Sequence, residues 1–98
     1  MNIEEALQCL SNQTRLRCLH LLAQSDEVCV CEFVDTLGIT QPTASKALAA
    51  LKNAGFLSDR RDANWNYYRL SSNMPQWQRD LLTATIAGMR ASANANDS

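Results

Sequence analysis

Two cysteines separated by one residue, Cys29 and Cys31, are the residues of this sequence that most directly suggest chemistry. Thiolates are soft ligands that select soft ions, so the pair could bind a thiophilic metal or metalloid. Cys9 and Cys18 could each supply a third sulfur, although a lone cysteine also commonly fills a core as a small hydrophobe. The close pair could instead oxidise to a strained disulfide, which would make the protein a thiol redox sensor.

The composition predicts one small domain in a reducing compartment. With 98 residues, of which 46% are hydrophobic, the chain is long enough for one modest core and too short for two. The first residues have neither the basic nor the apolar region of a secretion signal, and no apolar run approaches the roughly 20 residues of a membrane span. We therefore expect a cytoplasmic protein with no membrane contact, a domain over residues 1–92 and a flexible tail over residues 93–98.

The charged residues are distributed unevenly along the chain. Residues 1–40 contain two basic and six acidic side chains, whereas residues 41–70 contain five basic and two acidic ones. Although the net charge of the whole chain is -1, a local positive segment is the footprint that a phosphate backbone attracts. The sequence therefore favours a nucleic-acid partner that contacts residues 41–70.

Three short helices are predicted in the first 40 residues. Apolar residues recur at helical spacing over residues 3–10 and again over residues 16–22, with capping residues between the two runs. Cys31 lies where the N-cap of a third helix is expected, and Gly38 lies where that helix should end.

A fourth helix is predicted over residues 41–55, because proline stands near its first position and glycine at its end. Its apolar face is formed by Ala44, Leu48 and Leu51. Two short helices joined by a turn that contains glycine form a helix-turn-helix, whose second helix can enter a major groove. The polar residues of this helix that are candidates for contacts with bases or phosphates are Gln41, Thr43, Ser45 and Lys46.

A β-hairpin is predicted after the fourth helix. Strand-like residues 56–61 and 65–70 flank the turn-forming residues 62–64. Arg60 and Arg61 lie near the tip of this hairpin, where they could contact phosphates or the neighbouring minor groove.

A last helix that begins near Met74 has an apolar surface that is wide for so small a domain. We expect this helix, together with the first helix, to bury against a second copy and form a homodimer. The predicted interface residues are Leu7, Trp77, Leu81, Leu82, Thr85 and Met89.

The order of these elements, mainly α with a small β-hairpin, is that of a winged helix-turn-helix. Three stretches in this order resemble the ArsR/SmtB family of metalloregulators: SNQTRLRCLHLLA, EVCVCEFVDTLGITQPTASKALAALKNAGFL and SDRRDANWNYYRL. The resemblance covers roughly residues 5–70. It implies a homodimeric repressor that binds double-stranded operator DNA near its own gene and releases it when a toxic metal or metalloid binds. Without a glycine-rich phosphate loop or a CxxC pair, the sequence predicts neither an enzyme nor a small-molecule substrate.

The thiol pair resembles the arsenic-sensing branch of this family, in which CVC is followed three residues later by another cysteine. Cys29 and Cys31 match the first two, and Val34 stands where the third would be. The resemblance implies As(III) or Sb(III) as the inducer, with Cys9, Cys18 or a small cellular thiol as the third ligand. A response to cadmium, lead or zinc, or to oxidants, stays an alternative. The acidic and histidine ligands that some members place on the last helix are absent here.

Helix geometry suggests how ion binding could act as a switch. Residues i and i+2 point to nearly opposite sides of a helix, so one ion could not hold both thiols across a regular helix. We therefore expect chelation to keep residues 29–31 out of the third helix and to shift the recognition helix packed on it. The helix N-terminus should also favour the thiolate of Cys31.

Overall fold

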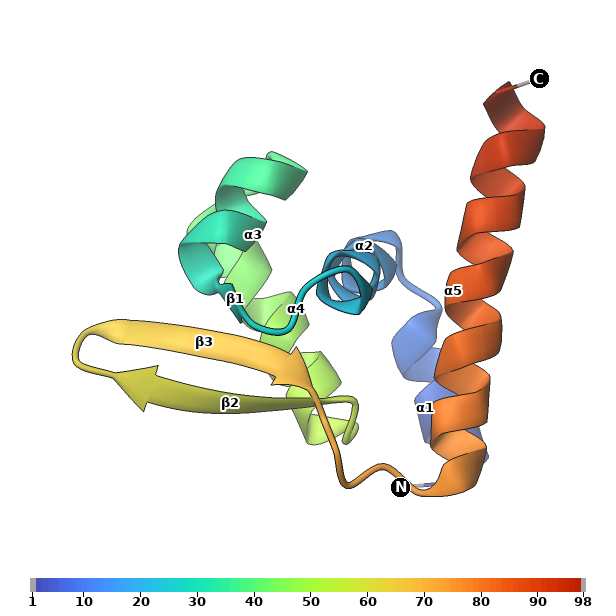
Figure 1. Ribbon diagram of the computed structural model, residues 1–98, viewed down its shortest axis with the longest axis horizontal. Helices are drawn as coiled ribbons and strands as arrows, with labels where there is room; N and C mark the ends of the chain where they lie inside the picture. The colour runs from blue at the N-terminus through green and yellow to red at the C-terminus, as the bar shows by residue number, and fades with distance from the viewer. Residues whose placement is uncertain (1, 98) are drawn as a thin grey trace.

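The computed structural model describes the backbone of residues 2–97 and the side chains of residues 2–93. Five helices and three short strands form a winged helix-turn-helix (Figure 1). The helices are α1 (Ile3–Leu10), α2 (Gln13–Ala23), α3 (Val30–Leu37), α4 (Gln41–Asn53) and α5 (Gln76–Asp97), and the strands are β1 (Val28–Cys29), β2 (Leu57–Asp62) and β3 (Trp65–Leu70). The predicted fold class is therefore confirmed.

Local capping interactions set the helix boundaries. The side chains of Asn2, Asn12 and Thr40 each accept a hydrogen bond from the backbone N–H three residues later, at the starts of α1, α2 and α4. Helix α3 ends at Gly38, whose φ of 65° is the left-handed conformation that favours glycine. The turn that follows joins α3 to α4 and completes the helix-turn-helix.

The hydrophobic core lies where α2, α3 and α4 pack against the sheet. The predicted apolar face of α4 is confirmed, because Ala44, Leu48 and Leu51 are fully buried. Phe33 of α3 packs edge-on against Tyr68 of β3, with the ring centroids 6.5 Å apart. This contact fixes α3 against the strand that carries the hairpin.

The sheet contains a strand that the sequence did not predict. Its order is β1-β3-β2, and Val28 and Cys29 of β1 pair antiparallel with Tyr68 and Tyr67 of β3. A two-residue strand is too short to produce a recognisable alternation of apolar and polar residues.

The hairpin of β2 and β3 extends away from the helices, on the side opposite to α5 (Figure 1). Its register pairs Leu57 with Leu70 at the base and Asp62 with Trp65 at the tip. Lys52, near the end of α4, pairs with Asp59 of β2 at 2.9 Å. The hairpin, or wing, is thereby held in place beside the recognition helix.

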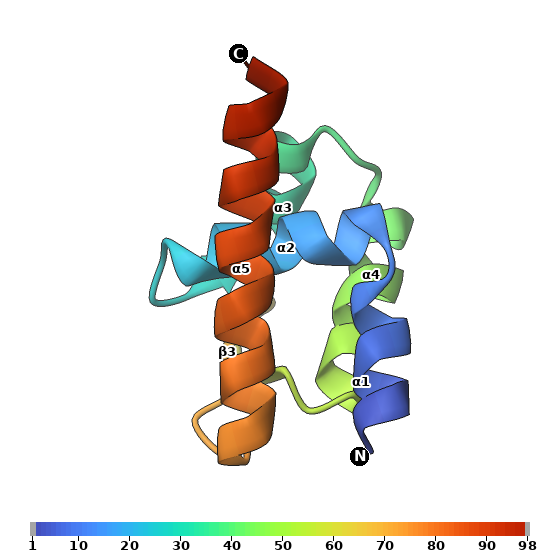
Figure 2. The same cartoon turned by 90° about the vertical axis from the view of Figure 1, so that its right-hand side faces the viewer.

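Helix α5 runs along one side of the molecule (Figure 2). It is attached to α4 by the buried Gln78, whose amide donates a 2.8 Å hydrogen bond to the carbonyl of Ala54. The helix continues to Asp97, so the backbone of residues 93–97 is helical where the sequence predicted a tail; alanine-rich segments without glycine or proline favour a helix. Ser98 lies outside the described residues. No helix within residues 2–97 is both long and apolar enough to span a bilayer.

The turn of the wing predicts a stabilising substitution. Ala63 has a φ of 55°, a left-handed conformation that costs a residue with a Cβ about 1 to 2 kcal/mol. Glycine would remove this cost, but part of the gain in stability is offset by the greater freedom of glycine in the unfolded chain. We expect Ala63→Gly to raise the free energy of unfolding by about 0.5 to 1 kcal/mol, measured by urea denaturation.

The matched control is Ala49→Gly on the exposed face of α4, which should lower the free energy of unfolding by about 1 kcal/mol. Destabilisation by both substitutions would contradict a strained turn at Ala63.

Candidate functional site

Cys29 and Cys31 lie at the junction between β1 and α3. Cys29 is the last residue of β1 and the N-cap of α3, with an extended backbone (φ -75°, ψ 150°), and Cys31 is the second residue of the helix. The prediction that Cys31 is the N-cap was therefore wrong, because the strand ends at Cys29 and the helix begins directly after it. Cys29 is 5% exposed, whereas Cys31 is open to solvent.

The two sulfur atoms face each other. They are 2.9 Å apart, and the Cys31 thiol donates a hydrogen bond to Cys29 Sγ. The two side chains can face each other because Cys29 is extended and lies outside the helix. Two sulfurs that share one ion at the ~2.3 Å bond length of a zinc thiolate lie about 3.8 Å apart. An ion could therefore bind both sulfurs after they separate by about 1 Å, with α3 intact.

The pKa of the Cys31 thiol is raised, first because its proton is held in the hydrogen bond to Cys29 and further by burial and the adjacent negative charges. A hydrogen bond from the backbone N–H of Glu32 lowers this pKa, but by less. The helix N-terminus therefore acts in the expected direction on Cys31, but the hydrogen bond to Cys29 has the larger effect on its pKa. An ion that binds both sulfurs must displace the proton of each thiol, including the one that Cys31 donates to Cys29.

The thiol pair opens into a groove that also reaches the recognition helix and the wing. The groove has a volume of about 410 Å³. Its lining includes Cys29, Cys31 and Asp35 beside α3, Gln41 and Ser45 of α4, and Arg61, Asn64, Trp65 and Asn66 of the hairpin. The structure thus brings together the predicted ligands and three of the predicted DNA-contacting residues. No spacing in the sequence indicates this groove, because its walls come from segments that are distant along the chain.

The other two cysteines lie away from the groove. Cys18 is fully buried in α2, and burial raises the pKa of its thiol to about 11. Cys9 is half-buried in α1, where its thiol points toward the carbonyl of Ala50 at 3.8 Å. Burial also raises the pKa of Cys9, against an opposing effect of Arg15. Both side chains pack within the helical part of the molecule.

The polar residues predicted to contact DNA share the exposed surface of α4. Gln41, Thr43, Ser45 and Lys46 are all exposed. A second hollow, of about 340 Å³, places Thr14 and Arg15 of α2 beside Thr43 and Lys46. Thr14 and Arg15 were not predicted from the sequence, because only the packing of α2 on α4 places them on this surface.

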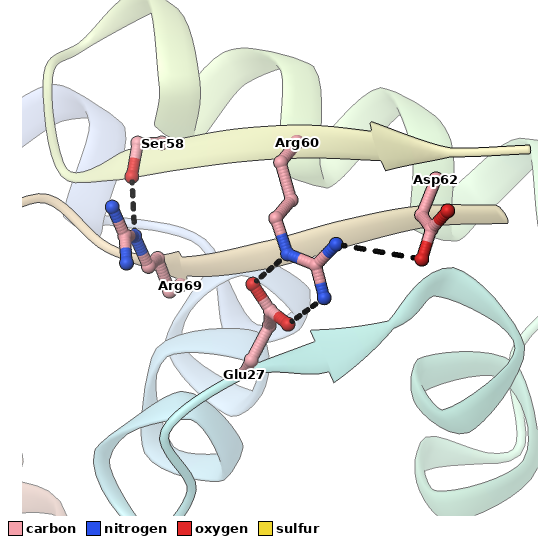
Figure 3. Close-up of polar contacts among 5 residues, drawn as sticks. All are labelled: Glu27, Ser58, Arg60, Asp62 and Arg69. Carbon is pink, nitrogen blue, oxygen red and sulfur yellow. Dashed lines mark hydrogen bonds and ion pairs between the residues drawn. The ribbon is translucent and has the colours of Figure 1, made fainter.

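The two arginines of the wing have different surroundings. Arg60 donates two hydrogen bonds, of 2.7 and 2.8 Å, to the carboxylate of Glu27 (Figure 3). Its guanidinium also lies 4.7 Å from the centre of the Tyr67 ring and 3.8 Å from Asp62. Arg61 lines the groove and has no ion pair with any residue that the structure describes. The sequence did not distinguish these neighbours, because the partner of Arg60 is 33 residues away.

The hydrogen bond from Arg60 lowers the pKa of Glu27. A carboxylate with a lowered pKa contributes stability that is present at neutral pH and is lost as the pH falls through that lowered value. The pair therefore ties the wing to the start of β1 under ordinary conditions.

The predicted dimer residues are divided between surface and core. Leu7 is 50% and Trp77 38% exposed, and Leu81, Thr85 and Met89 are half-buried. Leu82 is only 5% exposed, because it packs into the core of its own chain.

The shared proton of the thiol pair predicts how Cys31 reacts. Because its pKa is raised above the ordinary value of 9.0, the rate of alkylation of Cys31 by iodoacetamide should still be rising with pH at pH 9. Cys29→Ala removes the hydrogen-bond acceptor and should make Cys31 react faster at pH 7, as measured by peptide mass spectrometry. Buried Cys18 is the internal control that should stay unmodified. A Cys31 rate that is unchanged by Cys29→Ala would contradict the shared proton.

Sequence comparisons relate this chain to bacterial transcriptional regulators. The family model "Bacterial regulatory protein, arsR family" matches residues 12–59, which span α2, α3, α4 and the start of β2. An arsenic resistance transcriptional regulator of Pseudomonas putida, ArsR1, is 43% identical over 81% of this chain, and the match spans 62% of that relative's length. A second regulator of that organism, ArsR2, is 40% identical over 84% of this chain and 71% of its own length.

Solved structures show the same architecture. An antimony-specific transcriptional repressor, AntR, superposes with a TM-score of 0.73 at 27% identity, over 95% of this chain and 78% of that one. A homodimeric winged helix-turn-helix DNA-binding domain from Mycobacterium bovis superposes with a TM-score of 0.71 at 29% identity, over 94% of this chain and 78% of that one. The sequence relatives and the shared fold show that this chain belongs to the ArsR family of bacterial transcriptional regulators.

Proposed function

We propose that this protein is a repressor that binds operator DNA as a homodimer and releases it when As(III) or Sb(III) binds Cys29 and Cys31. The observation that supports this most strongly is the groove in which both thiols lie beside Gln41, Ser45 and Arg61. Relatives named as arsenic resistance regulators, and a structural neighbour named as antimony-specific, support the choice of inducer. We expect it to act in the cytoplasm, where thiols stay reduced.

The donor set favours a soft ion. Two sulfurs that already lie 2.9 Å apart need little rearrangement to share one ion, and thiolates select soft ions over hard ones. The fully buried Cys18 and the half-buried Cys9 lie outside the groove. We therefore assign sensing to Cys29 and Cys31 alone.

The recognition helix and the wing would contact DNA through their exposed polar residues. Gln41, Thr43 and Ser45 have side chains that can hydrogen-bond to bases or phosphates, and Lys46 supplies positive charge. In the wing, Arg61 is the better candidate for a phosphate or minor-groove contact, because Arg60 is paired with Glu27.

The shared groove gives a direct route from inducer to DNA release. An ion held by the two thiols would change the charge and shape of the wall between Gln41 and Arg61, where DNA would also have to fit. Binding of the two ligands is then mutually unfavourable, and each lowers the affinity of the other by the same factor. We propose this step in place of the exclusion of residues 29–31 from α3, because the sulfurs are already close together.

The homodimer would use α1 and α5. Leu7 and Trp77 are large apolar side chains that are exposed in one copy, and the half-buried Leu81, Thr85 and Met89 extend the surface along α5. Leu82 belongs to the core and would support this surface from beneath. Two half-sites one turn of DNA apart would match the two-fold symmetry of such a dimer.

An oxidant or another soft ion is the second candidate for the inducer. The specific observation is that the hydrogen-bonded sulfurs, 2.9 Å apart, would have to approach by only about 0.9 Å to form a disulfide. Treatment with peroxide or with Cd²⁺ in place of arsenite separates these alternatives. If peroxide or Cd²⁺ releases the DNA and arsenite does not, the agent that releases it is the better candidate for the inducer.

The inducer assignment predicts the behaviour of single thiol variants. Arsenite should weaken binding of the reduced protein to a fluorescent fragment from its own upstream region by about 5- to 150-fold, measured by anisotropy. Cys31→Ser should bind the DNA and lose this response, whereas Cys9→Ser is the matched control that should retain it. A full response from Cys31→Ser would overturn the assignment.

The different surroundings of the two wing arginines predict different effects on DNA binding. Arg61→Ala should lower the affinity and reduce the slope of log affinity against log salt by about 1, as expected for one lost phosphate contact. Arg60→Ala should change this slope less, because Glu27 already neutralises that charge. A larger change in slope for Arg60→Ala than for Arg61→Ala would contradict this assignment and show that the Arg60–Glu27 pair opens when DNA binds.

A further inference from the structure

We propose that the groove holds a small carboxylate-bearing thiol, which supplies the third sulfur to a trivalent metalloid bound by Cys29 and Cys31, with Arg61 binding its carboxylate. This inference rests on the proposed function and identifies the form in which the inducer is bound. Three features of the groove support it: the number of sulfurs, the space beside them, and the charge that faces this space.

The protein presents two sulfurs to an ion that forms three bonds. Within the part of the chain that the structure describes, no three His, Cys, Asp or Glu side chains are grouped to hold one ion. Cys18 is fully buried, and Cys9 points toward Ala50 in another part of the molecule. The third ligand must therefore come from outside this chain.

The space beside the thiols is much larger than a solvent ligand needs. A water or hydroxide occupies about 30 Å³, whereas the groove has a volume of about 410 Å³, within the range of small-molecule sites. Its lining also includes hydrogen-bonding groups from Ser45, Asn64 and Asn66, and the indole ring of Trp65. A molecule with several polar groups fits this lining better than a bare ion does.

Arg61 offers one wall of the groove as a binding place for an anionic group. Arg61 lines the groove, and no acidic side chain among the described residues pairs with it. A guanidinium binds a carboxylate through two parallel hydrogen bonds. Asp35 of α3 also lines the groove. Because its negative charge repels a carboxylate, the carboxylate of the bound thiol should lie toward Arg61 of the wing.

The reaction is an exchange of ligands on trivalent arsenic. Arsenous acid has three hydroxyl groups, and each is replaced by one thiolate: Cys29, Cys31 and the small thiol. Three arsenic–oxygen bonds break and three arsenic–sulfur bonds form, while the three thiol protons leave with the three hydroxyls as water. Arsenic stays trivalent, so no oxidant or reductant is needed.

The test uses the full-length protein, kept reduced with a phosphine, and no DNA. Arsenite is titrated in the presence of millimolar mercaptoacetate, mercaptoethanol or no added thiol, with tryptophan fluorescence as the measure of affinity. Native mass spectrometry identifies the complex. We expect mercaptoacetate to tighten the apparent affinity about three- to tenfold over mercaptoethanol, and the mass to correspond to protein, one arsenic and one thiol per site.

Arg61→Gln should reduce the difference between the two thiols, whereas Arg60→Gln, at the neighbouring arginine, should preserve it. Equal affinities with all three solutions, or a complex of protein and arsenic without thiol, would overturn this inference while leaving the proposed function intact. An arsenic bridging two chains without added thiol would likewise overturn it, because the second copy then supplies the third sulfur. Absence of arsenite binding under every condition would contradict the proposed function itself.

Discussion

The pairing of Val28 and Cys29 with β3 is the constraint on which the candidate site depends. These two residues add a third strand to the wing, and the chain turns into α3 directly after them. Because Cys29 is held extended, its sulfur can face that of Cys31 from outside the helix. A regular helix that began earlier would have directed the two thiols apart.

The contacts around this strand connect the site to the wing and the recognition helix. Glu27, just before β1, binds Arg60 of the wing, and Phe33, one turn into α3, packs on Tyr68 of β3. Lys52 and Asp59 join the end of α4 to β2. The recognition helix, the wing and the thiol pair therefore form one packed unit, so under the proposed function an ion at the thiols would act where DNA is held and not at a remote position.

The sequence predicted the helices well and the site less completely. The leucine spacing, the capping residues and Gly38 identified the helix-turn-helix, because these signals are local. The same local reasoning misplaced the start of α3, since a two-residue strand that exists only by pairing with β3 has no pattern of its own. It also treated Arg60 and Arg61 alike, because the partner of Arg60 is distant along the chain. The groove could not be predicted, since it exists only where the start of α3, the recognition helix and the wing meet.

The central claim is that the thiols and the DNA use the same groove, and the accessibility of Cys31 tests it most directly. The rate of alkylation of Cys31 would be measured by peptide mass spectrometry on the free protein and on the protein saturated with its operator fragment, without any inducer. The account predicts that DNA slows this reaction markedly, because the groove is closed in the complex. Equal rates in the two states would contradict it and would place the thiol pair away from the bound DNA.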